Sequence, residues 1–182
     1  MMNVNALFAL LVFLLLAGCS LPRIIVLNDP LDAQQHNDLG VAYEQRGEYD
    51  LALREYGRAA GRDKDWALPL FNSGNVHARL EQWPAAVAAY EAALKLDGRA
   101  LPLMNNLAWA LVQIGESRRG LSLAEEVVGR DGTDPGYWDT LAAAYQAAGR
   151  PEDAAQAARR GLLLDPSPEL SQALRSRISG PP

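Results

Sequence analysis

The sequence repeats a pattern of apolar and small residues at intervals of 34 residues. In the last copy the pattern runs through Trp138, Leu141, Ala142 and Tyr145, with Ala154 further along. Stepping back one, two and three intervals gives corresponding sets: Met104, Leu107, Ala108, Leu111 and Gly120; Leu70, Ser73, Gly74, His77 and Ala86; His36, Leu39, Gly40, Tyr43 and Ala52. Four units therefore begin at Ala33, Ala67, Leu101 and Pro135, with no insertion between them. An uninterrupted repeat of this length predicts units that stack on one another.

Each unit is expected to form two amphipathic helices separated by a short turn. Gly or Pro interrupts the middle of every unit, in "EQRGEYD", "EQWPAAV", "QIGESRRG" and "AAGRPED". Small residues recur at one level of the first helix, where they would let the second helix approach closely: Gly40, Gly74, Ala108 and Ala142. Tyrosines would fill the space between neighbouring pairs: Tyr43, Tyr56, Tyr90 and Tyr145. Because one helix pair cannot bury its apolar face alone, we expect stacking to supply the stability.

These residues resemble the pattern of the tetratricopeptide repeat family, and the resemblance covers about three quarters of the chain. It implies an all-α fold, a right-handed α-solenoid of four tandem 34-residue helix-turn-helix repeats at residues 33–66, 67–100, 101–134 and 135–168. Residues 169–182 are expected to form a capping helix and a frayed tail, with Ser167 as N-cap and Pro168 in the first turn. The apolar stripe of that helix would be Leu170, Ala173, Leu174 and Ile178.

The N-terminus carries features of an export signal. Residues 6–17, "ALFALLVFLLLA", form an apolar run that is too short to span a bilayer and suits a signal-peptide core. The run ends in Leu16-Ala17-Gly18-Cys19, which resembles the lipobox of bacterial lipoproteins. The resemblance implies cleavage after residue 18 and lipidation of Cys19, although "MMNVN" lacks the usual Lys or Arg. Ser20 in place of Asp favours the outer membrane, so we expect a lipid-anchored protein that faces the periplasm.

The lipidated cysteine and a tether would occupy residues 19–32. Pro22 and Pro30 break regular structure there, and Asp32 is a candidate N-cap for the first helix. Residues 24–27, "IIVL", are more apolar than a free tether needs to be. They would pack against the first repeat or dock on a partner.

The family resemblance also implies a binding groove. In tetratricopeptide arrays the first helix of each repeat lines a concave surface with positions 2, 5, 9, 12 and 13, counted from the unit start, and position 6 lies at its edge. This numbering places Phe71, Asn75, Asn105 and Trp109 in the groove, with Asn72 and Asn106 beside them; Asn37 also falls at position 5, and Arg79 at the rim. Amides can donate and accept hydrogen bonds with a peptide backbone, and aromatic rings concentrate binding energy. The predicted partner is a protein or peptide; the alternative is that Phe71 and Trp109 pack against neighbouring helices.

Composition argues against several other functions. The net charge of −5 leaves no positive footprint for nucleic acid, and a single cysteine permits neither an internal disulfide nor a thiolate metal cluster. His36 and His77 fall at positions expected to pack in the core, and no nucleophile elbow, paired-histidine motif or phosphate loop occurs. We therefore expect no enzyme activity, no cofactor, no metal and no small-molecule substrate.

The function predicted from the sequence is a non-catalytic, lipid-anchored scaffold of the bacterial cell envelope that takes part in assembling an envelope complex. Two alternatives stay open at this point. One is a pilotin-like factor for type IV pilus assembly, a role served by other lipoproteins of this type. The other is an adaptor that presents substrates to an envelope peptidase or a peptidoglycan enzyme.

Overall fold

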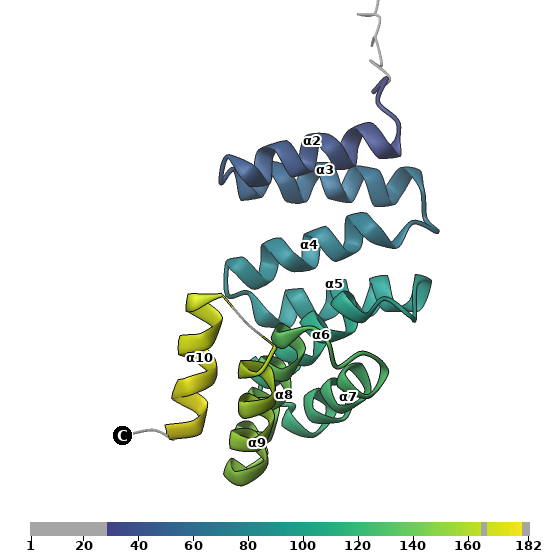
Figure 1. Cartoon of the computed structure of the whole chain (residues 1–182). Coiled ribbons are helices and arrows are strands. Elements are labelled where there is room, and N and C mark those ends of the chain that lie inside the picture. Colours follow the sequence, from purple (N-terminus) through teal and green to yellow (C-terminus); the bar gives the residue numbers. More distant parts are fainter. Residues whose placement is uncertain (1–28, 165–166, 180–182) are drawn as a thin grey trace, which may run out of the picture. The chain divides into compact units, whose positions relative to one another are not determined.

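The structure, a computed structural model, describes residues 29–164 and 167–179. These residues form helices and no strands, and the helices belong to one unit that begins at Leu31. They follow one another as α2 (Ala33–Gln45), α3 (Tyr49–Arg62), α4 (Ala67–Arg79), α5 (Trp83–Leu96), α6 (Leu101–Gln113), α7 (Ser117–Arg130), α8 (Pro135–Ala147), α9 (Pro151–Leu162) and α10 (Pro168–Ser179) (Figure 1). The first eight form four antiparallel pairs, and each pair packs on the next. The predicted all-α solenoid is confirmed.

The first helix of each pair begins at the residue where the sequence pattern placed a unit start: Ala33, Ala67, Leu101 and Pro135. Asp32 caps α2, because its Oδ1 accepts the N–H of Gln35 while the Gln35 side chain accepts the N–H of Asp32. Asp134 caps α8 by accepting the N–H of Gly136. Prolines lie in the first turn of α5, α6, α8 and α9, where a missing N–H costs no helical hydrogen bond.

The turns inside the pairs also recur at the same interval. Gly47, Gly115 and Gly149 adopt the left-handed backbone conformation that ends the first helix of their repeats. In the second repeat the same position is Glu81, with φ of 56°, a conformation that a side chain makes less favourable.

Two glycines let the paired helices approach closely. A Cβ atom added at Gly40 would lie 2.6 Å from Cδ1 of Tyr56, and one added at Gly74 would collide with the ring of Tyr90. Both rings are buried, so each tyrosine fills the space that its glycine leaves. In the third repeat the close contact is reversed: Gly120 of α7 faces the backbone of Ala108 in α6.

The C-terminal helix α10 covers the last repeat, as predicted. The side-chain oxygen of Ser167 accepts the N–H of Leu170, which fixes the start of the helix. Leu174 is 0% exposed and joins the apolar core of α8 and α9, with Leu170 and Ile178 packed beside it. The helix lies next to α8 and α9 (Figure 1).

The predicted signal peptide, Cys19 and residues 20–28 of the tether lie outside the described residues. Among residues 29–164 and 167–179, no helix has both the length and the apolar composition needed to cross a bilayer.

Candidate functional site

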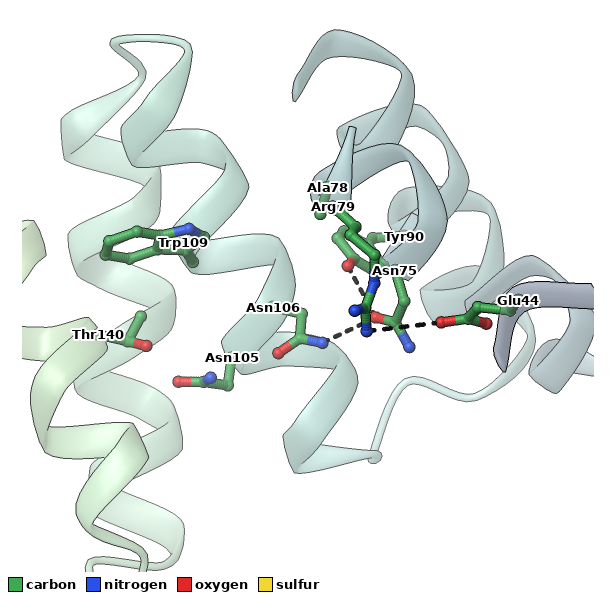
Figure 2. A pocket seen from close by; sticks show the side chains of 9 residues that line it. All are labelled: Glu44, Asn75, Ala78, Arg79, Tyr90, Asn105, Asn106, Trp109 and Thr140. Atoms are coloured by element: carbon green, nitrogen blue, oxygen red, sulfur yellow. Dashed lines mark hydrogen bonds and ion pairs between the residues drawn. The ribbon is translucent and has the colours of Figure 1, made fainter. Parts of the chain in front are cut away.

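The first helices of the four repeats line two adjoining cavities, which we call the amide groove. One has a volume of about 480 Å³ and is lined by Glu44, Asn75, Ala78, Arg79, Tyr90, Asn105, Asn106, Trp109 and Thr140 (Figure 2). The other, of about 580 Å³, is lined by Val41, Glu44, Gln45, Arg46, Gly47, Tyr49, Tyr56, Asn72, Asn75 and Arg79. Glu44, Asn75 and Arg79 border both, so the groove runs across residues contributed by α2, α4, α6 and α8.

Amide side chains of successive first helices are hydrogen-bonded to one another across the repeats. Nδ2 of Asn72 donates to Oδ1 of Asn37 at 3.0 Å, and Nδ2 of Asn106 donates to Oδ1 of Asn75 at 3.0 Å. Oδ1 of Asn75 also accepts the Tyr90 hydroxyl at 2.8 Å, which uses both of its lone pairs (Figure 2). These bonds link successive first helices, and they occupy polar atoms that would otherwise be open to a partner.

Two polar atoms of this network still border the cavity. Nδ2 of Asn75 and Oδ1 of Asn106 make no hydrogen bond within the described part of the chain. One is a donor and the other an acceptor, and the bond between the two side chains holds them close together. Such a pair can bond the N–H and C=O of one residue in an extended peptide, because these two groups point to the same side of the chain.

Charged residues lie at one edge of the groove. Arg79, with a side chain that is 61% exposed, lies 3.8 Å from the carboxylate of Glu44. Glu44 also accepts the hydroxyl of Tyr56 at 2.8 Å. Burial, aided by the hydrogen bond to Glu44 and its negative charge, raises the pKa of Tyr56 above the usual value. Tyr56 therefore stays protonated and donates to Glu44, which is also the ion-pair partner of Arg79.

At the other end, an arginine from α10 reaches the groove. Nε of Arg177 donates to Oδ1 of Asp139 at 2.6 Å, and its Nη1 donates to the Gln146 amide oxygen at 3.0 Å. Its guanidinium lies 5.8 Å from the ring centre of Trp109. The apolar stripe of this helix predicts only a cap, yet a further 34-residue step puts Arg177 at position 9, the position of Asn75 and Trp109.

The structure places most of the residues predicted for the groove in its two cavities, and others outside them. Asn75, Asn105, Asn106, Trp109 and Arg79 line one cavity together, and Asn72 lines the adjoining one, as described above. Asn37 borders neither, because it is 3% exposed and serves as the acceptor for Asn72.

Phe71 lies apart from the amide groove. Its ring packs against the core, with its centre 6.0 Å from that of Tyr90. It borders a separate, mainly apolar cavity of about 240 Å³, together with Ala67, Leu68, Asp97, Ala100, Pro102 and Leu103. Phe71 therefore packs partly against a neighbouring helix, as the alternative interpretation of the sequence expects, and partly borders this separate cavity.

The two histidines differ in their surroundings. His36 is fully buried, and its Nδ1 lies 2.8 Å from a carboxylate oxygen of Glu55. His77 was expected in the core, but it is only half-buried and bonds the side chain of Gln82, in the turn that follows α4. In the described ranges, no group of three or more His, Cys, Asp or Glu side chains is arranged to hold a metal ion.

Comparisons with known proteins agree with this architecture. MamA from Desulfovibrio magneticus RS-1 is similar in structure, with a TM-score of 0.72 and 24% identity over 81% of this chain and 84% of that chain. TTC0263, a TPR protein from Thermus thermophilus, gives a TM-score of 0.69 and 19% identity over 81% of each chain. YrrB, described as a TPR protein with an unusual peptide-binding site, gives 0.68 and 19% over 81% of this chain and 77% of that chain.

At these identities the likeness to solved structures is one of fold. No curated protein sequence matches the chain. The sequence profile of the tetratricopeptide repeat, however, matches residues 23–65 and 71–135, which together make up more than half of the chain. The chain therefore belongs to the tetratricopeptide repeat family.

Proposed function

We propose that this protein is a non-catalytic scaffold, lipid-anchored in the bacterial outer membrane, that binds an extended segment of a partner protein in the amide groove. The observation that carries the proposal is the cavity in which Asn75, Asn105, Asn106 and Trp109 meet. It offers a half-buried indole for a side chain, and beside it amide donors and acceptors for main-chain groups.

The electrostatics of the groove favour a partner segment with little net charge in its centre. The charged side chains near its two ends are paired, Arg79 with Glu44 and Arg177 with Asp139. Between them, Asn75, Asn105, Asn106 and Trp109 present neutral groups. The peptide-binding site named for YrrB, which has a similar fold, supports the same kind of use. Assembly of an envelope complex is the role that fits a membrane-held module of this kind.

The groove is tested with an affinity-purification comparison. Wild-type protein and Trp109→Ala are immobilised, and bound envelope proteins are quantified by mass spectrometry together with the melting temperature of each bait. We expect a partner whose recovery falls at least tenfold with Trp109→Ala while the melting temperature changes little, because Trp109 lies outside the apolar clusters of the core. The proposal fails if no recovered protein depends on Trp109, or if the variant unfolds.

The anchor is tested separately. It rests on the sequence Leu16-Ala17-Gly18-Cys19, so Cys19→Ala is expected to abolish incorporation of labelled fatty acid and leave an unprocessed precursor. Ser20→Ala keeps the cysteine and serves as the control, which should still be labelled. Equal labelling of wild type and Cys19→Ala would disprove lipidation at this residue.

A further inference from the structure

The outer face of α9, on the second helix of the last repeat, carries a single row of exposed side chains. The row consists of Glu152, Gln156, Arg159 and Leu163, whose spacing of four, three and four residues places them on one side of a helix. Leu163 is 84% exposed, more than any other large apolar side chain in the described ranges. The second helices of the earlier repeats have glycine or lysine at its repeat position: Gly61, Lys95 and Gly129.

The charges of α9 are divided between its two ends. Glu152 and Asp153 lie in the first turn, and Arg159 and Arg160 lie in the last. A second copy of α9 that runs in the opposite direction would therefore bring each acidic end beside a basic end, whereas a parallel copy would bring like charges together. Asp153 is already bound by Arg150. Glu152 and Arg159 form no ion pair with the residues that the structure describes, so both can bind a second copy.

The same charge distribution also suits the dipole of α9, so the charges alone do not require a partner. In α7, Arg118 and Glu125 stand at the repeat positions of Glu152 and Arg159, with the signs reversed. There Glu125 is already bound by Tyr145 of its own chain. Among the four second helices, α9 is the one whose outer face combines an unpaired charge near each end with an exposed leucine.

We propose that the outer face of α9 is a dimer interface, on which a second copy of this chain packs its own α9 in the antiparallel direction. Glu152 of each copy pairs with Arg159 of the other, and Gln156 faces its counterpart close to the two-fold axis. In this register Leu163 extends past the start of the helix in the other copy, where the apolar side chain of Ala148 is exposed. The inference does not rest on the amide groove.

The interface is tested by covalent trapping, because one pair of 12-residue helices is a small interface that dissociates readily. Cells that make the full chain with Gln156→Cys are treated with a short bis-maleimide crosslinker. The two introduced thiols lie near the symmetry axis and should be linked into a dimer. Arg54→Cys, at the same repeat position on the exposed face of α3, is the matched control, and wild type measures any contribution of Cys19. If Gln156→Cys gives no more dimer than Arg54→Cys, the proposal is overturned.

The ion pairs are tested by exchanging charges in the Gln156→Cys protein. Glu152→Arg sets like charges against each other and should lower the yield of dimer by about fivefold, and adding Arg159→Glu should restore it. If the charges serve only the dipole of α9, the second change lowers the melting temperature further and restores no dimer. That result would overturn the proposal.

The apolar contact is tested at a side chain that contributes little to folding. In the Gln156→Cys protein, Leu163→Asp should lower the yield of dimer by about fivefold, whereas Leu163→Met should keep it. Melting temperatures of both variants should match that of the parent protein, because residue 163 is exposed. Equal yields of dimer from Leu163→Asp and Leu163→Met would contradict the proposed interface, whether or not the charge-exchanged protein folds.

Discussion

Replacing Gly74 by alanine tests the closest packing in the fold. Gly74 lies in the interior of α4 against the ring of Tyr90 in α5, and a Cβ atom there would be 2.5 Å from Cδ1 and 3.0 Å from Cζ of that ring. The ring cannot move aside easily, because Tyr90 is 1% exposed and its hydroxyl is held by Asn75. The added methyl group must therefore push α4 and α5 apart or distort the tyrosine.

The expected change follows from two opposing contributions. Alanine is favoured over glycine inside a helix by about 1 kcal/mol. Overpacking a well-filled core costs about 1–3 kcal/mol. We therefore expect Gly74→Ala to lower the free energy of unfolding by up to about 2 kcal/mol, although helix propensity alone would raise it. Gly57→Ala in α3 is the control. Apart from the neighbouring residues and the backbone of α3 itself, no atom lies within 4 Å of the added Cβ, so only the gain of about 1 kcal/mol remains.

The assay is urea unfolding of wild type and both variants, followed by circular dichroism. We predict that the free energy of unfolding falls in Gly74→Ala and rises in Gly57→Ala. The slope of this free energy against urea concentration should be the same in all three proteins. A third variant, Gly74→Ala combined with Tyr90→Leu, should show little added cost from the alanine, because the ring that it collides with is gone. If Gly74→Ala stabilises the protein as Gly57→Ala does, the glycine is not needed for close approach and the reasoning is refuted.

Two further predictions concern the cap and the buried tyrosines. Ending the chain after Asp165 removes α10 and uncovers the apolar surface around Leu141, so the free energy of unfolding should fall by about 2–5 kcal/mol. Amide exchange should then be fastest in α8 and α9, and slow exchange there would show that α10 is not a cap. Burial raises the pKa of Tyr90 to about 12, although a side-chain hydrogen bond with Asn106 lowers it, and the charge of Glu44 adds a smaller rise. Because this pKa lies above the value in the unfolded chain, the contribution of Tyr90 to stability is complete below pH 10 and is lost as the pH rises from about 10 to 12. Urea unfolding across that range should show falling stability in wild type and a shallower fall in Tyr90→Phe, and equal slopes would contradict the assignment.

Much of the fold could be predicted because its determinants are local and periodic. The spacing of Ala33, Ala67, Leu101 and Pro135 predicted the helix starts, and the small residues Gly40 and Gly74 predicted where paired helices approach closely. Position counting likewise brought Asn75, Asn105, Asn106 and Trp109 into one cavity. These features depend on helical periodicity and repeat length, which a sequence shows directly.

The rest depends on which side chains pair, and periodicity does not determine that. Asn37 shares a repeat position with Asn105, yet it is an internal acceptor because an asparagine follows it in the next repeat and a threonine follows Asn105. Phe71 packs against Tyr90 and lies outside the cavity of the amides, which its repeat position alone does not indicate. Arg177 could not be predicted from the apolar stripe of the tail, because that stripe indicates only a cap and says nothing about the pairing of Arg177 with Asp139.

Site-specific photo-crosslinking in living cells tests the central claim, that the amide groove holds a partner protein. A photoreactive amino acid is placed at position 109, inside the groove, and in a second strain at Arg54, an exposed residue of α3 that lines neither cavity of the groove. We predict a discrete adduct with one partner at position 109, absent at position 54 and weakened by Asn105→Leu. Equal adducts at both positions, or none at position 109 in cells where the protein is made and folded, would contradict it.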